Sequence, residues 1–433
     1  MGPLRVGAAK VDITPASDVL PVHYLGVLDP VFARAIVVDN GDVQMALVTV
    51  DVISLTDASF ARVSAEIERT TGIPRDRQLI AGTGTHSVPT GGPGSPDGSS
   101  PVMARIEGQI VEAVAAAQAR RIPARMSYGE GRSWINVQRD RIDPETRRWW
   151  EGPDYDGASD KEVGVLSFTD LQGTPVAAYF NYGVFNVVTG MLDLVSGDVS
   201  GAASRYIEEA TGDGFVAAFA LGAHGDQNPI FFNQTFELRD LRIEEYAARG
   251  EDIRIAMPPP GGTGLDRSNP RVARLMEQQK QVNAALGLML GEEVLRVIRD
   301  APDGVSEASI HMARGETTCP GRVRTNQGRG GVTGTYRDGD PVVVRYGLAL
   351  IGDVAIGSVN GAPYADIGSR LRTKSPFTRT MLLTRANGYV GYMPSDAAYG
   401  HETFAVLNTR LKPGCAEDAI VEGILSLVPP LTY

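Results

Sequence analysis

Short β-rich runs alternate with helical patterns along the whole chain of 433 residues, and no segment repeats at a fixed period. This alternation is typical of a layered α/β fold built on a mostly buried sheet. The β-rich runs lie at 34–38, 45–55, 78–83, 163–169, 176–188, 214–223, 342–359 and 380–392. We therefore predict a layered α/β/α domain with a central mixed sheet, formed as a single unit by residues 1–433.

Local signals support particular elements of this fold. The Asn40-Gly41 pair supplies the positive φ of a tight turn, so it predicts a hairpin between the first two runs. Apolar residues recur at helical spacing over 271–299 and predict a helix with one buried face. Two stretches, at about 141–161 and 249–269, are too long for simple connections, and we expect them to be loop insertions.

The charge balance limits the partners of the chain. It carries 41 Lys+Arg against 52 Asp+Glu, a net charge of −11, which has the wrong sign for binding nucleic acid or an anionic membrane. There is no apolar run of the ~20 residues that a spanning helix needs, and residues 1–20 show no signal peptide. We expect a cytoplasmic protein with a small-molecule substrate, without nucleic acid or membrane as a partner, and a possible homo-oligomer.

The two cysteines, Cys319 and Cys415, allow at most one disulfide and cannot build a thiolate zinc site. Cys319 could alternatively be a nucleophile, but no base lies near it in the sequence. We therefore do not expect a central catalytic or metal-binding role for the two thiols.

Small and polar residues concentrate at the ends of four predicted strands. These clusters read GTGTHS at 82–87, SGDVS at 196–200, GAHGDQNP at 222–229 and NGYVGY at 387–392. Ligands of open α/β sheets bind outside the carboxyl ends of strands, and glycine there lets backbone and ligand approach closely. The four clusters together predict a ligand site, although each alone could be a tight turn.

Several segments resemble the neutral/alkaline non-lysosomal ceramidase family. They are GAAKVDITP at 7–15, LDPVFARA at 28–35, VDVISL at 50–55, THS at 85–87, GDQNP at 225–229 and NGYVGY at 387–392. They follow the order of the family and span nearly the whole chain. The resemblance implies the catalytic domain alone, because the sequence leaves no room after Tyr392 for the C-terminal immunoglobulin-like domain of the large ceramidases.

The resemblance also implies a zinc ion held by two His, a Glu and a Tyr, which activates water to cut an N-acyl bond. Carried over position by position, the two His correspond to Gly84 and Phe185, and the Glu corresponds to Ala362. Only the tyrosine remains, as Tyr389 or, as a second choice, Tyr392. Since a zinc site usually needs at least three protein ligands, we predict no metal and no cofactor.

Ceramidase activity itself is not expected, because Asn228 stands where the family has its nucleophile-like serine. The polar groups that remain still favour an enzyme, with His best suited to proton transfer near neutral pH and the 222–228 turn suited to binding an oxyanion. Our predicted catalytic residues are His86, His224, Asp226, Asn228 and Tyr389. Our predicted substrate-binding residues are Ser87, Phe185, Asn186, Asp198, Asn360 and Tyr392.

Three functions remain open at this point. The preferred one is a metal-free, ceramidase-like enzyme that acts on an acyl or amide small molecule in specialised metabolism, as a cyclase, acyl transferase or amidase. The second is a zinc-dependent amidohydrolase whose site has shifted to His86, His224, Asp198 and Asp226. The third is a ligand-binding pseudoenzyme in which Phe185 and Ala362 line an apolar cleft.

Overall fold

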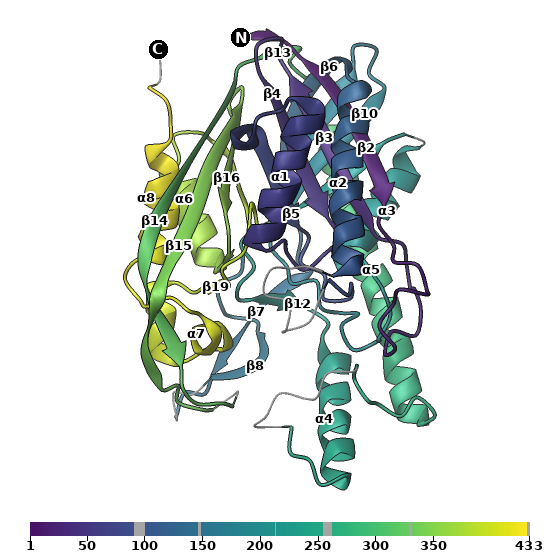
Figure 1. Cartoon of the computed structure of the whole chain (residues 1–433), viewed down its shortest axis with the longest axis vertical. Helices are drawn as coiled ribbons and strands as arrows, with labels where there is room; N and C mark the ends of the chain where they lie inside the picture. Colours follow the sequence, from purple (N-terminus) through teal and green to yellow (C-terminus); the bar gives the residue numbers. More distant parts are fainter. Residues whose placement is uncertain (91–99, 146–148, 213, 254–261, 329–330, 431–433) are drawn as a thin grey trace.

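The computed structural model describes residues 1–90, 100–145, 149–212, 214–253, 262–328 and 331–430. Its largest sheet has the order β11-β10-β9-β6-β2-β3-β4-β5 and is drawn in Figure 1. The strands are β2 (Arg5–Asp12), β3 (Phe32–Asp39), β4 (Gln44–Val50), β5 (Gln78–Gly82), β6 (Ile122–Arg132), β9 (Glu162–Asp170), β10 (Pro175–Tyr182) and β11 (Val216–Leu221). Its two halves join where β2 pairs with β6 over only two residue pairs. The pairing is mixed, since β4 and β5 are parallel, as are β10 and β11, while the other pairs are antiparallel.

A second sheet of four strands has the order β14-β15-β16-β18. Its strands are β14 (Ile310–Arg324), β15 (Tyr336–Ile351), β16 (Val354–Val359) and β18 (Arg379–Leu383). Three smaller pairings complete the sheets: β12 (Gln227–Pro229), β7 (Asn136–Ile142) and β8 (Trp149–Asp154) together, β1 (Gly2–Pro3) with β13 (Glu307–Ala308), and β17 (Ala362–Pro363) with β19 (Tyr392–Met393).

Helices cover the outer faces of both large sheets (Figure 1). These are α1 (Asp57–Thr71), α2 (Pro101–Ala119), α3 (Asp198–Thr211) and α5 (Pro270–Asp300) on the larger sheet, and α6 (Ala365–Lys374) and α8 (Ala416–Ser426) on the smaller one. Helix α4 (Asn233–Ala248) packs against α5 below the sheets, α7 (Phe404–Asn408) packs beside β19, and 3₁₀ turns lie at Arg75–Arg77 and Asp396–His401. The helix predicted over 271–299 is confirmed as α5, which Pro270 opens after the side chain of Asn269 caps its N-terminus. Helix α1 begins after the Thr56 cap and ends at Gly72, whose positive φ suits glycine.

The core follows from the alternation of side chains along each strand. In β3, Ile36 belongs to a cluster shared by both large sheets, whereas Val37 belongs to the cluster under α1 and α2. In β15, Ala349 faces the shared core and Leu348 faces the cluster under α6 and α8. The predicted mixed α/β fold is therefore confirmed, with a second sheet between the large sheet and the outer helices.

Some predicted elements differ in their extent. The run 342–359 is two strands separated by a turn at Gly352, and the run 380–392 is strand only as far as Leu383. The insertion expected at 141–161 is wrong as an irregular loop, because β7 and β8 form an antiparallel pair there. Residues 146–148 of that insertion, 254–261 of the other and 91–99 of the loop after β5 lie outside the described residues.

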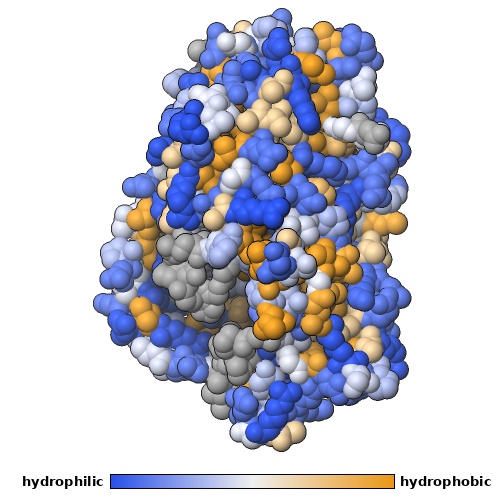
Figure 2. All heavy atoms as spheres, turned by 45° about the vertical axis from the view of Figure 1, so that its right-hand side comes forward, coloured by the Kyte–Doolittle hydropathy of each residue, from blue (hydrophilic) through white to orange (hydrophobic). Residues whose placement is uncertain are grey.

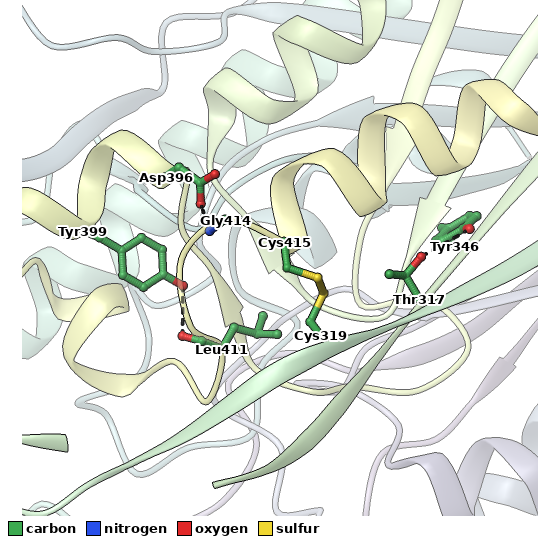
Figure 3. The surroundings of a disulfide bond; sticks show 8 residues. All are labelled: Thr317, Cys319, Tyr346, Asp396, Tyr399, Leu411, Gly414 and Cys415. Carbon is green, nitrogen blue, oxygen red and sulfur yellow. Dashed lines mark hydrogen bonds between the residues drawn. A yellow bond between two sulfur atoms is a disulfide. The ribbon is translucent and has the colours of Figure 1, made fainter. Parts of the chain in front are cut away.

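Cys319 on β14 and Cys415, just before α8, form a disulfide with a Cα–Cα distance of 5.7 Å (Figure 3). The disulfide takes Cys319 out of consideration as a nucleophile, since the thiolate is the reactive form. Disulfides persist mainly in oxidising compartments, so this bond does not support the cytoplasmic location expected from the sequence. That location stays a prediction.

Among the described residues, no helix is long and apolar enough to cross a membrane. The face seen in Figure 2 is hollowed, and apolar residues gather beside the hollow. The most exposed large apolar side chains of the molecule include Val22 and Leu25, in the segment between β2 and β3, at 96% and 60% exposure.

Candidate active site

The loops that follow four strands meet at one place. The backbone N–H of His86, after β5, donates to the carbonyl of Asn186, after β10, at 3.2 Å. The N–H of Thr384, after β18, donates to the carbonyl of Leu221, the last residue of β11, at 2.8 Å. These bonds hold the loops after β5, β10, β11 and β18 together, so residues far apart in the sequence can share a site.

Phe185 lies at the centre of this place and is 2% exposed. Its ring centroid is 4.7 Å from that of His224, 6.2 Å from that of Tyr392 and 6.5 Å from that of His86. The structure therefore brings three predicted site residues, His86, His224 and Tyr392, around the ring of a fourth, Phe185.

Arg139 of β7 reaches the same ring. Its guanidinium carbon lies 4.5 Å from the ring centroid of Phe185, 5.4 Å from that of Tyr392 and 5.3 Å from that of Phe404. Arg139 is only 4% exposed, and its Nε and Nη2 have no hydrogen-bond partner within the described part of the chain. Burial acts to lower the pKa of Arg139, but Tyr392 and Asp140 outweigh it and the pKa is raised, so the guanidinium stays charged.

Arg385 brings a second guanidinium. It follows β18 with a positive φ of 50°, is 2% exposed, and its guanidinium carbon lies 4.7 Å from the Tyr389 ring and 6.0 Å from the Phe185 ring. Its Nε donates to Nε2 of His224 at 3.0 Å and its Nη1 donates to the carbonyl of Ile53 at 2.9 Å. A non-glycine residue in the left-handed region often marks a functional site.

His224 is fully buried, and both of its ring nitrogens are engaged. Nδ1 lies 2.9 Å from the carbonyl of Gly222, to which it donates, while Nε2 accepts from Arg385. Burial, and then the charge of Arg385, hold the pKa of His224 well below its ordinary value. A neutral imidazole without a free nitrogen positions Arg385, so this geometry favours a positioning role over the catalytic role that we predict from sequence.

His86 differs from His224 because its side chain is exposed and its ring nitrogens have no hydrogen-bond partner among the described residues. Burial of its surroundings, followed by the charges of Arg385, Arg139 and Arg239, lowers the pKa of His86. His86 is neutral near pH 7 and offers a free nitrogen as a proton acceptor.

Tyr389 and Tyr392 are half-buried, and each places its ring against one of the two arginines. Within the described residues, neither hydroxyl has a hydrogen-bond partner. Burial raises the pKa of Tyr389, so its hydroxyl keeps its proton near pH 7 and can donate a hydrogen bond.

Asp226 and Asn228 lie beside β7 and are held by other groups. The Asp226 carboxylate accepts from the backbone N–H of Ala365 at 2.9 Å and from Nε2 of Gln138 at 2.7 Å. Burial, and then the nearby Asp140, raise the pKa of Asp226 to about 7. Asn228 donates to Glu151 at 3.3 Å. Both residues support the β7 and β12 strands behind Arg139, and their catalytic roles stay predictions.

Four predicted substrate-binding residues are buried and hydrogen-bonded within the protein. Asn186 donates to the carbonyl of Thr83 at 2.6 Å, and Asp198 accepts from the hydroxyl of Thr189. The remaining bonds join Ser87 Oγ to Thr189 Oγ1 at 2.8 Å, and Asn360 to the backbone of Val343 and Arg345 at 3.2 and 2.8 Å. These side chains fix the loops, and their substrate-binding role stays a prediction.

Sequence reasoning missed both arginines. Arg139 lies next to the stretch expected to be an irregular insertion, and the polar strand β7 gave no sign that its side chain is buried. Arg385 lies two residues before the cluster at 387–392, so extending that cluster by one turn would have included it.

The residues present do not fit the zinc ion that the resemblance implies. A Cβ atom on Gly84 would lie 2.9 Å from Leu221 Cδ2 and 3.7 Å from Arg385 Nε, so these side chains occupy the space beside it. Phe185 and Ala362 have no donor side chain, and no three His, Cys, Asp or Glu side chains of the described segments are grouped as a metal site. Absence of a metal nevertheless stays a prediction.

The chain resembles neutral ceramidases in part of its sequence and in its fold. The chain is 30% identical over 280 residues to the neutral ceramidase of Pseudomonas aeruginosa. The aligned region covers 57% of this chain and 41% of that protein. It is 31% identical over 172 residues to neutral ceramidase A of Dictyostelium discoideum, covering 36% of this chain and 24% of the relative. The chain thus matches less than half the length of these curated relatives, and no protein-family model matches it.

Solved structures show the same fold. The crystal structure of neutral ceramidase from Pseudomonas aeruginosa matches with a TM-score of 0.73 at 18% identity, over 99% of this chain and 74% of that one. A structure described as ceramidase complexed with C2 matches equally, over 99% of this chain and 75% of the other. The resemblance seen in the sequence motifs is confirmed.

Proposed function

We propose that this protein is a metal-free, ceramidase-like enzyme that acts on the acyl or amide group of a small molecule, as an amidase, acyl transferase or cyclase of specialised metabolism. The observation that carries the proposal is the pair of buried guanidinium groups beside the exposed, neutral His86. This arrangement combines a base that can activate a nucleophile with fixed positive charge that can stabilise an oxyanion. A zinc ion would otherwise perform both tasks.

The chemistry follows from these positions. His86 accepts a proton from the attacking hydroxyl, amine or water as the nucleophile adds to the acyl carbon. The carbonyl oxygen becomes an oxyanion, which tyrosine hydroxyls stabilise as donors within the positive field of the arginines. Collapse of the tetrahedral intermediate breaks the bond to the leaving group, and His86 returns the proton to that group.

Because of the charges of the site, formation of the oxyanion and proton uptake by His86 favour each other. The burial of its surroundings and the charges of three arginines oppose protonation of His86. Negative charge on the carbonyl oxygen offsets the arginine charge, so formation of the oxyanion favours proton uptake by His86. Arg385 is held for this by His224, which explains why a fully buried histidine lies in the site.

Hydrolysis of octanoyl p-nitroanilide and p-nitrophenyl octanoate tests the proposal, with release of the chromophore as the measurement. His86→Ala is expected to lower kcat/KM by ~10²- to 10⁴-fold, the usual range for loss of a general base. A metal chelator is expected to leave the rate unchanged. The matched control is His23→Ala, which removes an imidazole of the segment between β2 and β3.

Unchanged turnover in His86→Ala, or loss of turnover with the chelator, would contradict the proposal. Binding of these compounds without turnover would favour the pseudoenzyme instead.

A further inference from the structure

The charges around Phe185 do not balance. Arg139 and Arg385 are 4% and 2% exposed, and neither forms an ion pair within the described part of the chain. We propose that this pair of guanidinium groups binds the carboxylate of an acylated substrate, for example an N-acyl amino acid. The inference rests on the proposed function for its acyl part, and it names the substrate class.

The nearby carboxylates are engaged elsewhere. Asp140 accepts a hydrogen bond from the Tyr364 hydroxyl at 2.6 Å. Glu151 is paired with Arg239 at 2.8 Å, and Asp226 accepts from Gln138 and from the backbone of α6. None of these groups forms a hydrogen bond or an ion pair with Arg139 or Arg385, and Tyr392 and Asp140 act on Arg139 only through the longer-range attraction that raises its pKa.

The arginines also keep unused donors. Nε and Nη2 of Arg139 are buried without a partner among the described residues. Arg385 uses Nε and Nη1 for His224 and Ile53, and its Nη2 makes no hydrogen bond within the same residues. Buried donors and buried charges are costly to leave unpaired. A bound carboxylate would satisfy both needs, because its two oxygens match the planar fork of a guanidinium.

The surroundings of the pair suit an apolar body attached to the carboxylate. The rings of Phe185, Tyr392 and Phe404 lie against Arg139, and that of Tyr389 lies against Arg385. Solvent reaches the same place, since His86 is exposed and both tyrosines are half-buried. An aromatic wall beside a pair of cations therefore favours an acyl carboxylate over a small inorganic anion.

A carboxylate here would also act on the base. Arg385 and Arg139 are among the charges that lower the pKa of His86, after burial. An anion that offsets them raises the pKa of His86 toward its ordinary value and makes it a better proton acceptor. The enzyme would thus gain its working base when the correct substrate binds.

Isothermal titration with N-decanoylglycine and with its neutral analogue N-decanoylglycinamide tests the proposal. We expect the wild-type protein to bind the acid at least ~10-fold more tightly than the amide at pH 7. Arg385→Gln and Arg139→Gln should each reduce this preference to within about twofold, whereas Arg139→Lys should keep part of it. Arg379→Gln is the matched control, because Arg379 lies on the strand that leads to Arg385 and pairs with Asp353 at 2.9 Å.

Equal binding of acid and amide by the wild-type protein, or an unchanged preference in both Gln variants with native circular dichroism, would overturn the proposal. Tighter binding of inorganic phosphate than of the acyl carboxylate would overturn it as well. Should one Gln variant fail to fold, the other and the Lys variant still decide the outcome.

The failures of the two proposals are distinguishable. Turnover of the neutral anilide that depends on His86, without any preference for the acid, removes the carboxylate proposal alone. Preference for the acid that depends on Arg385, without turnover of any compound, removes the enzymatic proposal alone.

Discussion

Two regions of this protein bury arginine side chains, and they treat the charge in opposite ways. Arg34 of β3 is 1% exposed and pairs with Glu208 at 2.8 Å and with Asp51 at 3.0 Å. Lys10 adds a further contact to Glu208 at 2.7 Å. Arg139 is equally buried, yet it has no acidic partner within 4.0 Å among the described residues.

We interpret the paired Arg34 as a structural residue and the unpaired Arg139 as a functional one. The Arg34 network joins α3 to strands β2 and β3, and every charge in it meets its opposite within the protein. Around Phe185 the positive charge has no such partner, and such an imbalance persists only when it is offset elsewhere or used. Burial alone therefore does not identify a site, whereas burial without compensation does.

Removing Arg34 should have the largest effect. Arg34→Met would leave Asp51 buried without its ion-pair partner and Glu208 with only the partly exposed Lys10, so we expect a loss of ~3–5 kcal/mol in the free energy of unfolding. Urea denaturation followed by circular dichroism measures it. A loss below about 1 kcal/mol would show that the network is not structural, and the comparison between the regions would fail.

Loss of the disulfide should come next. The bond closes a loop of 96 residues that contains Arg385, Tyr389 and Tyr392, but not Arg34. Cys319→Ser with Cys415→Ser is expected to lower stability by about 2–4 kcal/mol, mainly through the unfolded chain. The apparent thermal midpoint measures the loss, and an unchanged midpoint would contradict it. The Arg34 region should keep its protection from hydrogen exchange in this variant.

Arg139→Met should cost less stability than Arg34→Met. The Arg139 guanidinium has no ion pair within the described part of the chain, and its Nε and Nη2 lack partners there, so the variant loses only the longer-range attraction of Tyr392 and Asp140. We expect the free energy of unfolding to fall by less than about 1 kcal/mol, while carboxylate binding is lost. Arg385→Met is the comparison, because Arg385 makes two side-chain hydrogen bonds and its loss should destabilise more. A loss as large as that of Arg34→Met would contradict the difference between the two regions.

The smallest effect concerns pH. The folded pKa of His224 lies below its unfolded value of ~6.5, so the unfolded chain takes up this proton first and stability falls as pH falls below that value. Between pH 7 and pH 6 the loss is under about 1 kcal/mol. His224→Asn should flatten this slope relative to wild type, while His23→Asn should leave it as it is. An identical slope in His224→Asn would contradict the assignment.

The sequence predicts the fold better than the site, for physical reasons. Apolar periodicity indicates which face of a helix is buried, so α5 could be predicted from local pattern. Turn residues indicate where a hairpin reverses, so the hairpin at Asn40-Gly41 could be predicted as well. The family motifs indicated His86, Phe185 and Tyr392, which do meet, and Tyr389, whose ring lies against Arg385. The sequence gives no sign that Arg139 or Arg385 is buried, because arginine is usually exposed and its burial depends on long-range packing, although Arg385 does lie beside the cluster at 387–392. For the same reason, the hydrogen bonds that engage Asp198 and Asn186 could not be foreseen.

The central claim is that Arg139 and Arg385, and not a metal ion, supply the positive charge of the proposed active site. The most direct measurement is the zinc content of protein purified without chelator, by elemental analysis, followed by titration of zinc into the same sample. The account predicts far less than one zinc ion per chain and no saturable binding that depends on Tyr389. One tightly bound zinc ion per chain, lost in Tyr389→Phe, would contradict it.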